Sequence, residues 1–131
     1  MRNLSLEEVL YIHELTIKKH GGSVGIKNLG LVESSLNSGI ATFDGKDLYP
    51  SIEEKISMIT YSFVKNHGFE DGNKRVGCLI LLTLCHKNGL GIKPSQKELI
   101  DFGLGVACGG LDKDDIKNFI ITQKSKYSGG I

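Results

Sequence analysis

The sequence predicts a single all-α domain over residues 1–131, a bundle of about six helices with one small β-hairpin flap. Apolar residues recur every three to four positions, which places them on one face of successive helices. A Ser-x-x-Glu capping box, which is a helix-start signal, precedes three of these segments. Strand signals are few, because the chain has only 2 prolines and its β-branched residues fall mostly at helical spacing. A chain of 131 residues can bury about two-thirds of its unfolded surface in one core.

The first part of the chain predicts two helices separated by a glycine-rich loop. A capping box at Ser5 and Glu8 opens a helix over residues 5–19, and two glycines end it at about residue 20. Its inward face is expected to comprise Leu6, Val9, Leu10, His13 and Ile17. After the loop Ser23–Gly30, a shorter helix is expected over about residues 31–38, with inward positions at Leu31, Ser35, Leu36 and Ile40.

Residues 42–50 read T-F-D-G-K-D-L-Y-P and predict a small hairpin, with its turn at Asp44 and Gly45. A second capping box, at Ser51 and Glu54, opens a helix that should end near residue 66. Its apolar positions are Ile52, Ile56, Met58, Ile59, Tyr61 and Phe63.

Three helices are predicted in the remainder of the chain. One begins at residue 73 or 74 and reaches about residue 88, where Gly89 and Gly91 stop it. Because it is apolar over most of its circumference, we expect it at the centre of the bundle. The third capping box, at Ser95 and Glu98, opens a helix to about residue 108. The last amphipathic helix spans residues 112–127 and should bury Ile116, Phe119, Ile120 and Gln123.

Composition excludes several function classes. The net charge of +1 carries no whole-protein attraction to nucleic acid or membrane. No apolar run approaches the roughly 20 residues that cross a bilayer, and residues 1–10 lack a signal-peptide pattern. The three cysteines, Cys78, Cys85 and Cys108, are expected to be reduced core residues of a cytoplasmic protein, since their number is odd and their surroundings are apolar. No histidines stand at metal-ligand spacing to them.

The stretch 67–75, reading H-G-F-E-D-G-N-K-R, concentrates polar groups at the start of the apolar helix. Asp71 can hold a divalent metal, and Gly72 lets backbone approach an anion. The three residues that follow supply further donors near a helix N-terminus, which attracts anions by itself: Asn73, Lys74 and Arg75. This chemistry suits a site that handles phosphate groups.

Each of these residues also has an ordinary structural interpretation. A histidine at a helix end can be a C-cap rather than a general base, and Asp71 can be a surface carboxylate or an N-cap. Asn73 alone is an ordinary N-cap residue, and Lys65 is more simply a solvated lysine. Two cations in the first turn oppose the helix dipole, however, so an anion such as a nucleotide phosphate with Mg²⁺ is expected there.

The order of these residues resembles the Fic/Doc signature, H-x-F-x-(D/E)-(G/A)-N-(G/K)-R. The version with Lys before the final Arg resembles the Doc (death-on-curing) toxins of toxin–antitoxin pairs. The resemblance extends to the G-G-x-x-G loop at residues 21–25, to the flap, and to a Lys-Asn-Gly turn at residues 87–89.

The resemblance implies a catalytic set of His67, Lys74 and Arg75 in which His67 deprotonates a target hydroxyl and Arg75 stabilises phosphate charge. It implies that Asp71 binds Mg²⁺ and that ATP is held by Gly72, Asn73, Lys74 and Arg75. Phe69 would be the buried anchor of the loop. The flap over residues 43–49 would hold the target polypeptide by adding a strand to its edge.

Three departures from the adenylyltransferase pattern of the family affect the expected reaction. This chain has Gly68 where those enzymes have proline, Lys74 where they have glycine, and Cys78 where they have a second arginine. The resemblance therefore implies an inverted nucleotide and transfer of the γ-phosphate to a Ser/Thr hydroxyl, with elongation factor Tu as target and arrest of translation as outcome. The self-inhibitory helix motif is not found, so restraint by a cognate antitoxin is expected.

Two alternatives stay open at this point. The same scaffold can transfer AMP to a protein hydroxyl. The chain can also be a catalytically inactive interaction module. Direct binding of nucleic acid is a weaker interpretation, because the cations do not form a stripe and aromatic residues are only 7% of the chain.

Overall fold

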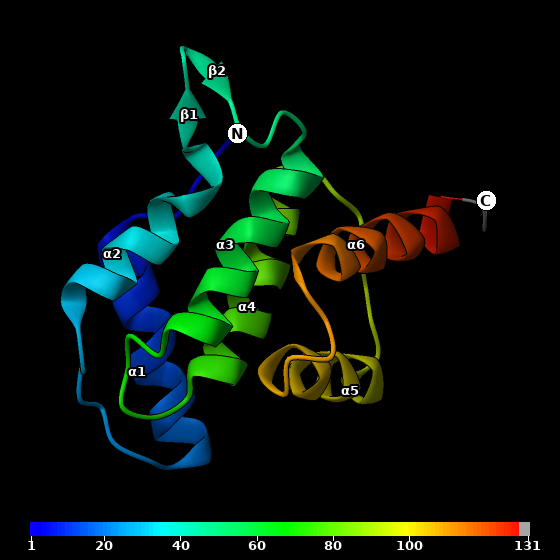
Figure 1. The fold of residues 1–131 in the computed structure, drawn as a ribbon. Coiled ribbons are helices and arrows are strands. Elements are labelled where there is room, and N and C mark those ends of the chain that lie inside the picture. Colours follow the sequence, from blue (N-terminus) through cyan, green and yellow to red (C-terminus); the bar gives the residue numbers. More distant parts are fainter. Residues whose placement is uncertain (129–131) are drawn as a thin grey trace.

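The computed structural model describes residues 1–128 and confirms the all-α bundle with one small hairpin (Figure 1). The elements in chain order are α1 Leu6–His20, α2 Leu29–Asn37, the 3-10 turn η1 Ser38–Ile40, β1 Thr42–Phe43, β2 Lys46–Asp47, α3 Ile52–Asn66, α4 Asn73–Lys87, α5 Gln96–Ala107 and α6 Lys113–Ser128. None of the helices in this part of the chain is long and apolar enough to cross a membrane.

The central element is α3, whereas the sequence predicted α4 at the centre of the bundle. Helix α3 packs against α2, α4, α5 and α6, whereas α4 packs against α1, α3 and α5. Helix α4 keeps a polar and partly open side, with Lys74, Arg75 and His86 exposed and the Leu79 side chain 41% exposed. The expectation failed because α4 buries Val76, Ile80, Leu81 and Leu84 on one face only.

The capping signals set most helix starts correctly. Ser5 and Ser95 each form a complete capping box. Ser51 accepts the Glu54 N–H, but its hydroxyl donates to the Glu54 carboxylate, so the reciprocal bond to the Ser51 backbone is not formed. Helices α1, α3 and α5 therefore begin where the sequence predicted.

The second helix differs from its prediction at both ends. It begins at Leu29, two residues early, because the side chain of Asn28 accepts the Leu31 N–H and caps it. Val32 takes a buried position, while Ile40 lies after the helix in η1 and is 48% exposed.

The cysteines do not all lie in the core. Cys85 is buried, and its surroundings raise the pKa of the thiol to about 12 through loss of solvent. Cys78 is half-buried, and Cys108 is exposed at the C-cap of α5, which corrects the prediction that all three are core residues. All three are free thiols.

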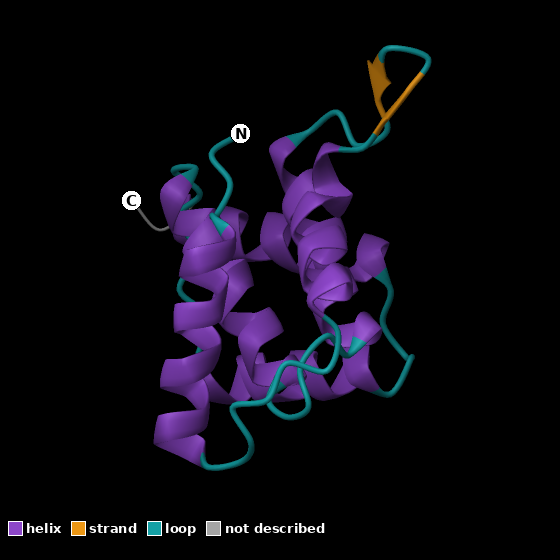
Figure 2. Ribbon diagram, turned by 90° about the vertical axis from the view of Figure 1, so that its left-hand side faces the viewer, coloured by secondary structure: helices purple, strands orange, loops and turns teal. Residues whose placement is uncertain are grey.

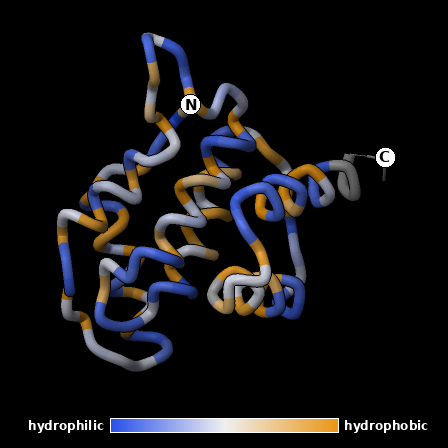
Figure 3. Tube along the Cα trace, in the orientation of Figure 1, coloured by the Kyte–Doolittle hydropathy of each residue, from blue (hydrophilic) through white to orange (hydrophobic). Residues whose placement is uncertain are grey.

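The predicted hairpin forms, with its turn at Asp44 and Gly45, both of which have positive φ (53° and 76°). Thr42 pairs with Asp47 and Phe43 with Lys46. The hydropathy-coloured trace shows the tip as hydrophilic (Figure 3). The hairpin projects from one end of the bundle, and the loop that follows α3 lies at the other end (Figures 1 and 2). Helix α3, which has 15 residues, separates the two by about 22 Å at 1.5 Å per residue.

Candidate active site

His67 ends α3 as its C-cap, in the left-handed conformation (φ 51°, ψ 51°). This conformation turns the chain out of the helix and into the loop that carries the other motif residues. The residue is exposed, and its ring has no hydrogen-bond partner among residues 1–128. The structural and the chemical interpretation of His67 are therefore compatible, because its backbone caps α3 while its ring stays free.

Phe69 anchors the loop as expected, with only 1% of its side chain exposed. The side chain of Asn73 holds the Phe69 backbone from the first turn of α4. Its Nδ2 donates to the Phe69 carbonyl at 2.9 Å, and its Oδ1 accepts the Phe69 N–H at 3.1 Å. Asn73 is 8% exposed, so its amide is used within the loop, and its backbone N–H is the group that it can offer to an anion.

Asp71 is exposed, and one oxygen of its carboxylate is already engaged. Oδ2 accepts the Ser23 N–H at 2.7 Å. The Ser23 hydroxyl donates to Glu70 Oε2 at 2.8 Å and accepts the Gly25 N–H at 3.0 Å. Two adjacent acidic residues of the motif are thus fixed by one serine of the α1–α2 loop, and Asp71 Oδ1 has no hydrogen-bond partner among the described residues.

The α1–α2 loop runs alongside the motif as a short antiparallel segment. Ile26 forms a bridge with Phe69, for which Glu70 N–H donates to Gly25 O and Lys27 N–H donates to Gly68 O. A side chain at Gly68 would meet Val32 Cγ2 at 2.7 Å, so the close approach of α2 explains this glycine. Sequence reasoning did not place this loop beside the motif, although the G-G-x-x-G pattern marked it as unusual.

His13 was predicted only as an inward position of the first helix, and the structure places it against the motif. Its ring stacks on Phe69 with centroids 3.8 Å apart and an interplanar angle of 9°. Its Nε2 lies 2.9 Å from the backbone oxygen of Asp71. The sequence feature that could have indicated this role is a histidine on an otherwise apolar helix face.

The start of α4 offers donors to an anion. Gly72 occupies the N-cap with φ 84° and makes no side-chain cap bond, so the N–H groups of the first turn have no partner within the helix. Lys74 and Arg75 are exposed and form no ion pair within residues 1–128. One free carboxylate oxygen, two free cations and open helix N–H groups fit a nucleotide phosphate with Mg²⁺, which commonly binds through one or two carboxylates plus phosphates.

Helix α5 covers the side of α4 next to these donors. A side chain at Gly103 would meet Cys78 Sγ at 3.1 Å and Lys74 Cγ at 3.3 Å, so the Lys74 stem lies along α5. Burial raises the pKa of the Cys78 thiol, and the nearby Lys74 charge opposes this shift.

The hairpin, which the resemblance expects to hold a target polypeptide at its edge, is not part of this cluster. It lies at the opposite end of α3, and the ion pair between Lys55 Nζ and Asp47 Oδ2 (3.0 Å) fixes it there. The segment beside the motif is the α1–α2 loop.

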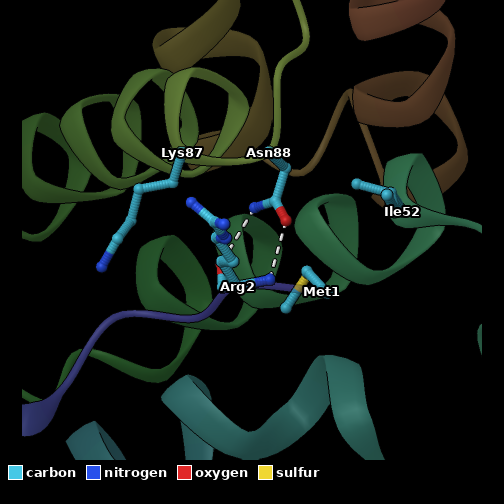
Figure 4. Close-up of a pocket in the computed structure, with 5 residues that line it drawn as sticks. All are labelled: Met1, Arg2, Ile52, Lys87 and Asn88. Carbon is cyan, nitrogen blue, oxygen red and sulfur yellow. Dashed lines mark hydrogen bonds between the residues drawn. The ribbon is translucent and has the colours of Figure 1, made fainter.

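One cavity lies at a distance from the motif. It has a volume of about 410 Å³ and lies at the far end of α4 (Figure 4), lined by Met1, Arg2, Ile52, Lys87 and Asn88. There the Asn88 amide clasps the Arg2 backbone: Arg2 N–H donates to Oδ1 at 2.7 Å, and Nδ2 donates to Arg2 O at 2.9 Å. We regard this cavity as a structural feature, because the residues with phosphate chemistry lie at the other end of the helix.

Comparison with known proteins agrees with the motif. The model of the Fic/DOC family matches residues 3–85, which include α1, the α1–α2 loop and the whole motif. Toxin Doc of Mycolicibacterium smegmatis is 33% identical over 70 residues, 53% of this chain and 54% of that protein. Protein kinase doc of Escherichia phage P1 is 28% identical over 109 residues, 83% of this chain and 85% of that protein. The chain thus spans about half the length of the first relative and most of the second.

Proposed function

The chain belongs to the Fic/DOC family, and on that premise we propose that it is a Doc-type toxin that transfers the γ-phosphate of ATP to a Ser/Thr hydroxyl of a protein. The observation that carries this proposal is the arrangement of the motif loop. Nine consecutive residues hold a histidine ring, a carboxylate oxygen and two cations that have no partner among the described residues, together with a helix start that has no side-chain cap. Phosphoryl transfer depends on such positioning and electrostatic stabilisation.

In this proposal the residues have separate tasks. His67 accepts the proton of the target hydroxyl, for which its exposed and unpaired ring is available. The first-turn N–H groups of α4, with Lys74 and Arg75, bind the phosphates and stabilise the charge of the transferred group. Asp71 would hold Mg²⁺, and the metal when bound would screen the phosphate charge. Phe69 and Asn73 keep the loop in shape.

The packing of α5 supports phosphate transfer over AMP transfer. Cys78 Sγ lies 3.9 Å from the Leu99 carbonyl and close to Gly103. Helix α5 therefore packs against position 78, where the adenylyltransferase pattern has its second arginine. Without that second arginine, Lys74 and Arg75 remain as the cations of this helix turn. In the proposal, these two cations bind the γ-phosphate end of the triphosphate.

The outer edge of the α1–α2 loop is our candidate docking site for the substrate polypeptide, in place of the hairpin. Gly25 and Lys27 bond inward to the motif loop. The N–H and C=O groups of Val24 and Ile26 have no hydrogen-bond partner within the described residues. Val24 is 64% exposed and Ile26 is 44% exposed. An extended peptide could add to this edge by backbone hydrogen bonds, with side-chain contacts to both residues.

The proposed target is elongation factor Tu, and the proposed regulator is a cognate antitoxin. The relatives named Toxin Doc and Protein kinase doc support a toxin with kinase chemistry for this chain as well. Modification of a translation factor would arrest growth, so a cell that carries such a protein needs a neutralising partner.

Two ATP samples, one labelled at the γ-phosphate and one at the α-phosphate, test the reaction type. We expect the protein with Mg²⁺ to transfer label to elongation factor Tu only from the γ-labelled sample. His67→Ala should transfer neither label and should relieve growth arrest when induced in cells. Transfer from the α-labelled sample would establish AMP transfer instead, and equal toxicity of both proteins would remove His67 from the mechanism.

A further inference from the structure

We propose that His13 of α1 is a positioning residue that fixes Asp71 for metal binding. The inference rests on the proposed function, because it takes Asp71 as the residue that holds Mg²⁺. His13 belongs to a different helix from the motif, 58 residues away in the chain. It is 3% exposed, so solvent does not explain a polar ring at this place.

The hydrogen bond from His13 has a defined direction. Its partner, the Asp71 backbone oxygen, can only accept, so Nε2 carries the hydrogen and donates at 2.9 Å. The stack on Phe69, with centroids 3.8 Å apart, sets the plane of the ring and therefore the direction of this N–H. The buried anchor of the loop and the Asp71 backbone are thus fixed by one side chain.

The Asp71 residue is held at both of its ends. His13 holds the peptide group between Asp71 and Gly72, and Ser23 N–H holds carboxylate Oδ2 at 2.7 Å. The same peptide group leads into the N-cap of α4, whose φ of 84° depends on its orientation. Loss of the His13 bond would let this peptide rotate. It would displace both the free Oδ1 of Asp71 and the N–H groups that face the phosphates.

Two substitutions separate the hydrogen bond from the packing. His13→Phe keeps an aromatic ring against Phe69 but has no donor for Asp71. His13→Gln loses the ring and keeps an N–H donor at about the same reach. Thr16→Val is the matched control, because it removes another buried hydrogen bond of α1 (Thr16 Oγ1 to Ile12 O, 2.8 Å) that does not involve the motif.

The measurement is calorimetric binding of a non-hydrolysable ATP analogue, titrated over a range of Mg²⁺ concentrations, with thermal unfolding of each variant. Residues that orient a metal ligand typically change metal affinity about 10–100-fold when replaced. We therefore expect His13→Phe to need at least about tenfold more Mg²⁺ for half-maximal binding. His13→Gln and Thr16→Val should stay within about threefold of the wild type, a small fraction of that effect.

Each outcome bears on a distinct claim. Wild-type Mg²⁺ dependence in His13→Phe would overturn the positioning role. If His13→Phe does not fold, His13→Gln decides: binding like the wild type supports the hydrogen bond, and a tenfold or greater loss overturns it. Failure of the wild type itself to bind the Mg²⁺–nucleotide would overturn the proposed function, and the role of His13 with it.

Discussion

At His67 the backbone is left-handed, which costs a residue with a side chain about 1–2 kcal/mol. Glycine would end α3 in this conformation without that cost. The chain keeps a histidine there, which is consistent with a role for the ring in the reaction. Strain of this kind persists where the surrounding structure fixes it, as the buried Phe69 and the Asn73 clasp do for this loop.

We expect His67→Gly to stabilise the protein by about 0.5–1 kcal/mol and to abolish phosphoryl transfer. Asp44→Gly is the matched control, since Asp44 is the other described non-glycine residue with positive φ (53°) and lies in the hairpin. It should stabilise by a similar amount and leave activity unchanged. Urea unfolding and the label-transfer assay measure both effects. A less stable His67→Gly would show that the strain is not released.

Asn73→Ala should destabilise the protein by about 2–4 kcal/mol, because it leaves the buried N–H and C=O of Phe69 without partners. Asn28→Ala, which removes the exposed cap of α2, is the comparison and should cost about 1 kcal/mol. Equal losses of unfolding free energy in the two variants would contradict the inferred role of Asn73 within the loop.

At the scale of elements, the ion pair between Glu53 and Lys124 joins α3 to α6. Lys124 Nζ lies 2.7 Å from Glu53 Oε1. This hydrogen bond is the main cause that lowers the pKa of Glu53 from its ordinary value of 4.5. A carboxyl whose pKa is lower in the folded state adds stability above its unfolded pKa, and the contribution disappears as the pH falls through the folded value.

Lys124→Met should therefore reduce the free energy of unfolding by about 0.5–1 kcal/mol at pH 7, and by much less below the lowered pKa of Glu53. Lys97→Met is the control, because Lys97 has no ion pair within residues 1–128 and should change stability little at either pH. Denaturant titrations at both pH values provide the comparison. A loss that is independent of pH would mean that α6 is held by the lysine stem rather than by its charge.

The order and bounds of the elements were largely predictable because their signals are local. Ser5 and Ser95 place their capping boxes where the sequence indicates, and Asp44-Gly45 forms the predicted turn. The start of α2 was missed because Asn28 caps it through one side-chain bond, with no box pattern.

The candidate site was predictable only in part. The motif residues are contiguous in the sequence, so the sequence alone predicts that they lie close together. The pairing of residues 23–27 with the motif and the stack of His13 on Phe69 depend on tertiary packing, which the sequence pattern does not indicate. The distance between the hairpin and the site could have been predicted from the sequence. A predicted helix of about 15 residues lies between them, and a helix of that length is rigid and about 22 Å long.

At the scale of the whole molecule, the bundle brings together the ends of α1, α3 and α4, with α2 and α5 beside them, so that one loop carries the reactive groups (Figure 1). The net charge of +1 gives no long-range attraction for a nucleotide. In the proposed function, nucleotide binding depends on the local arrangement of Lys74, Arg75 and the start of α4. We propose that this arrangement moves a phosphate from ATP to a protein hydroxyl.

Intact-mass spectrometry of elongation factor Tu, incubated with this protein, Mg²⁺ and ATP, distinguishes phosphate transfer from AMP transfer. We predict a mass increase of one phosphoryl group on a serine or threonine, absent when His67→Ala replaces the wild type. A mass increase of one AMP group, or an unmodified factor under conditions in which the wild type arrests growth, would contradict the account.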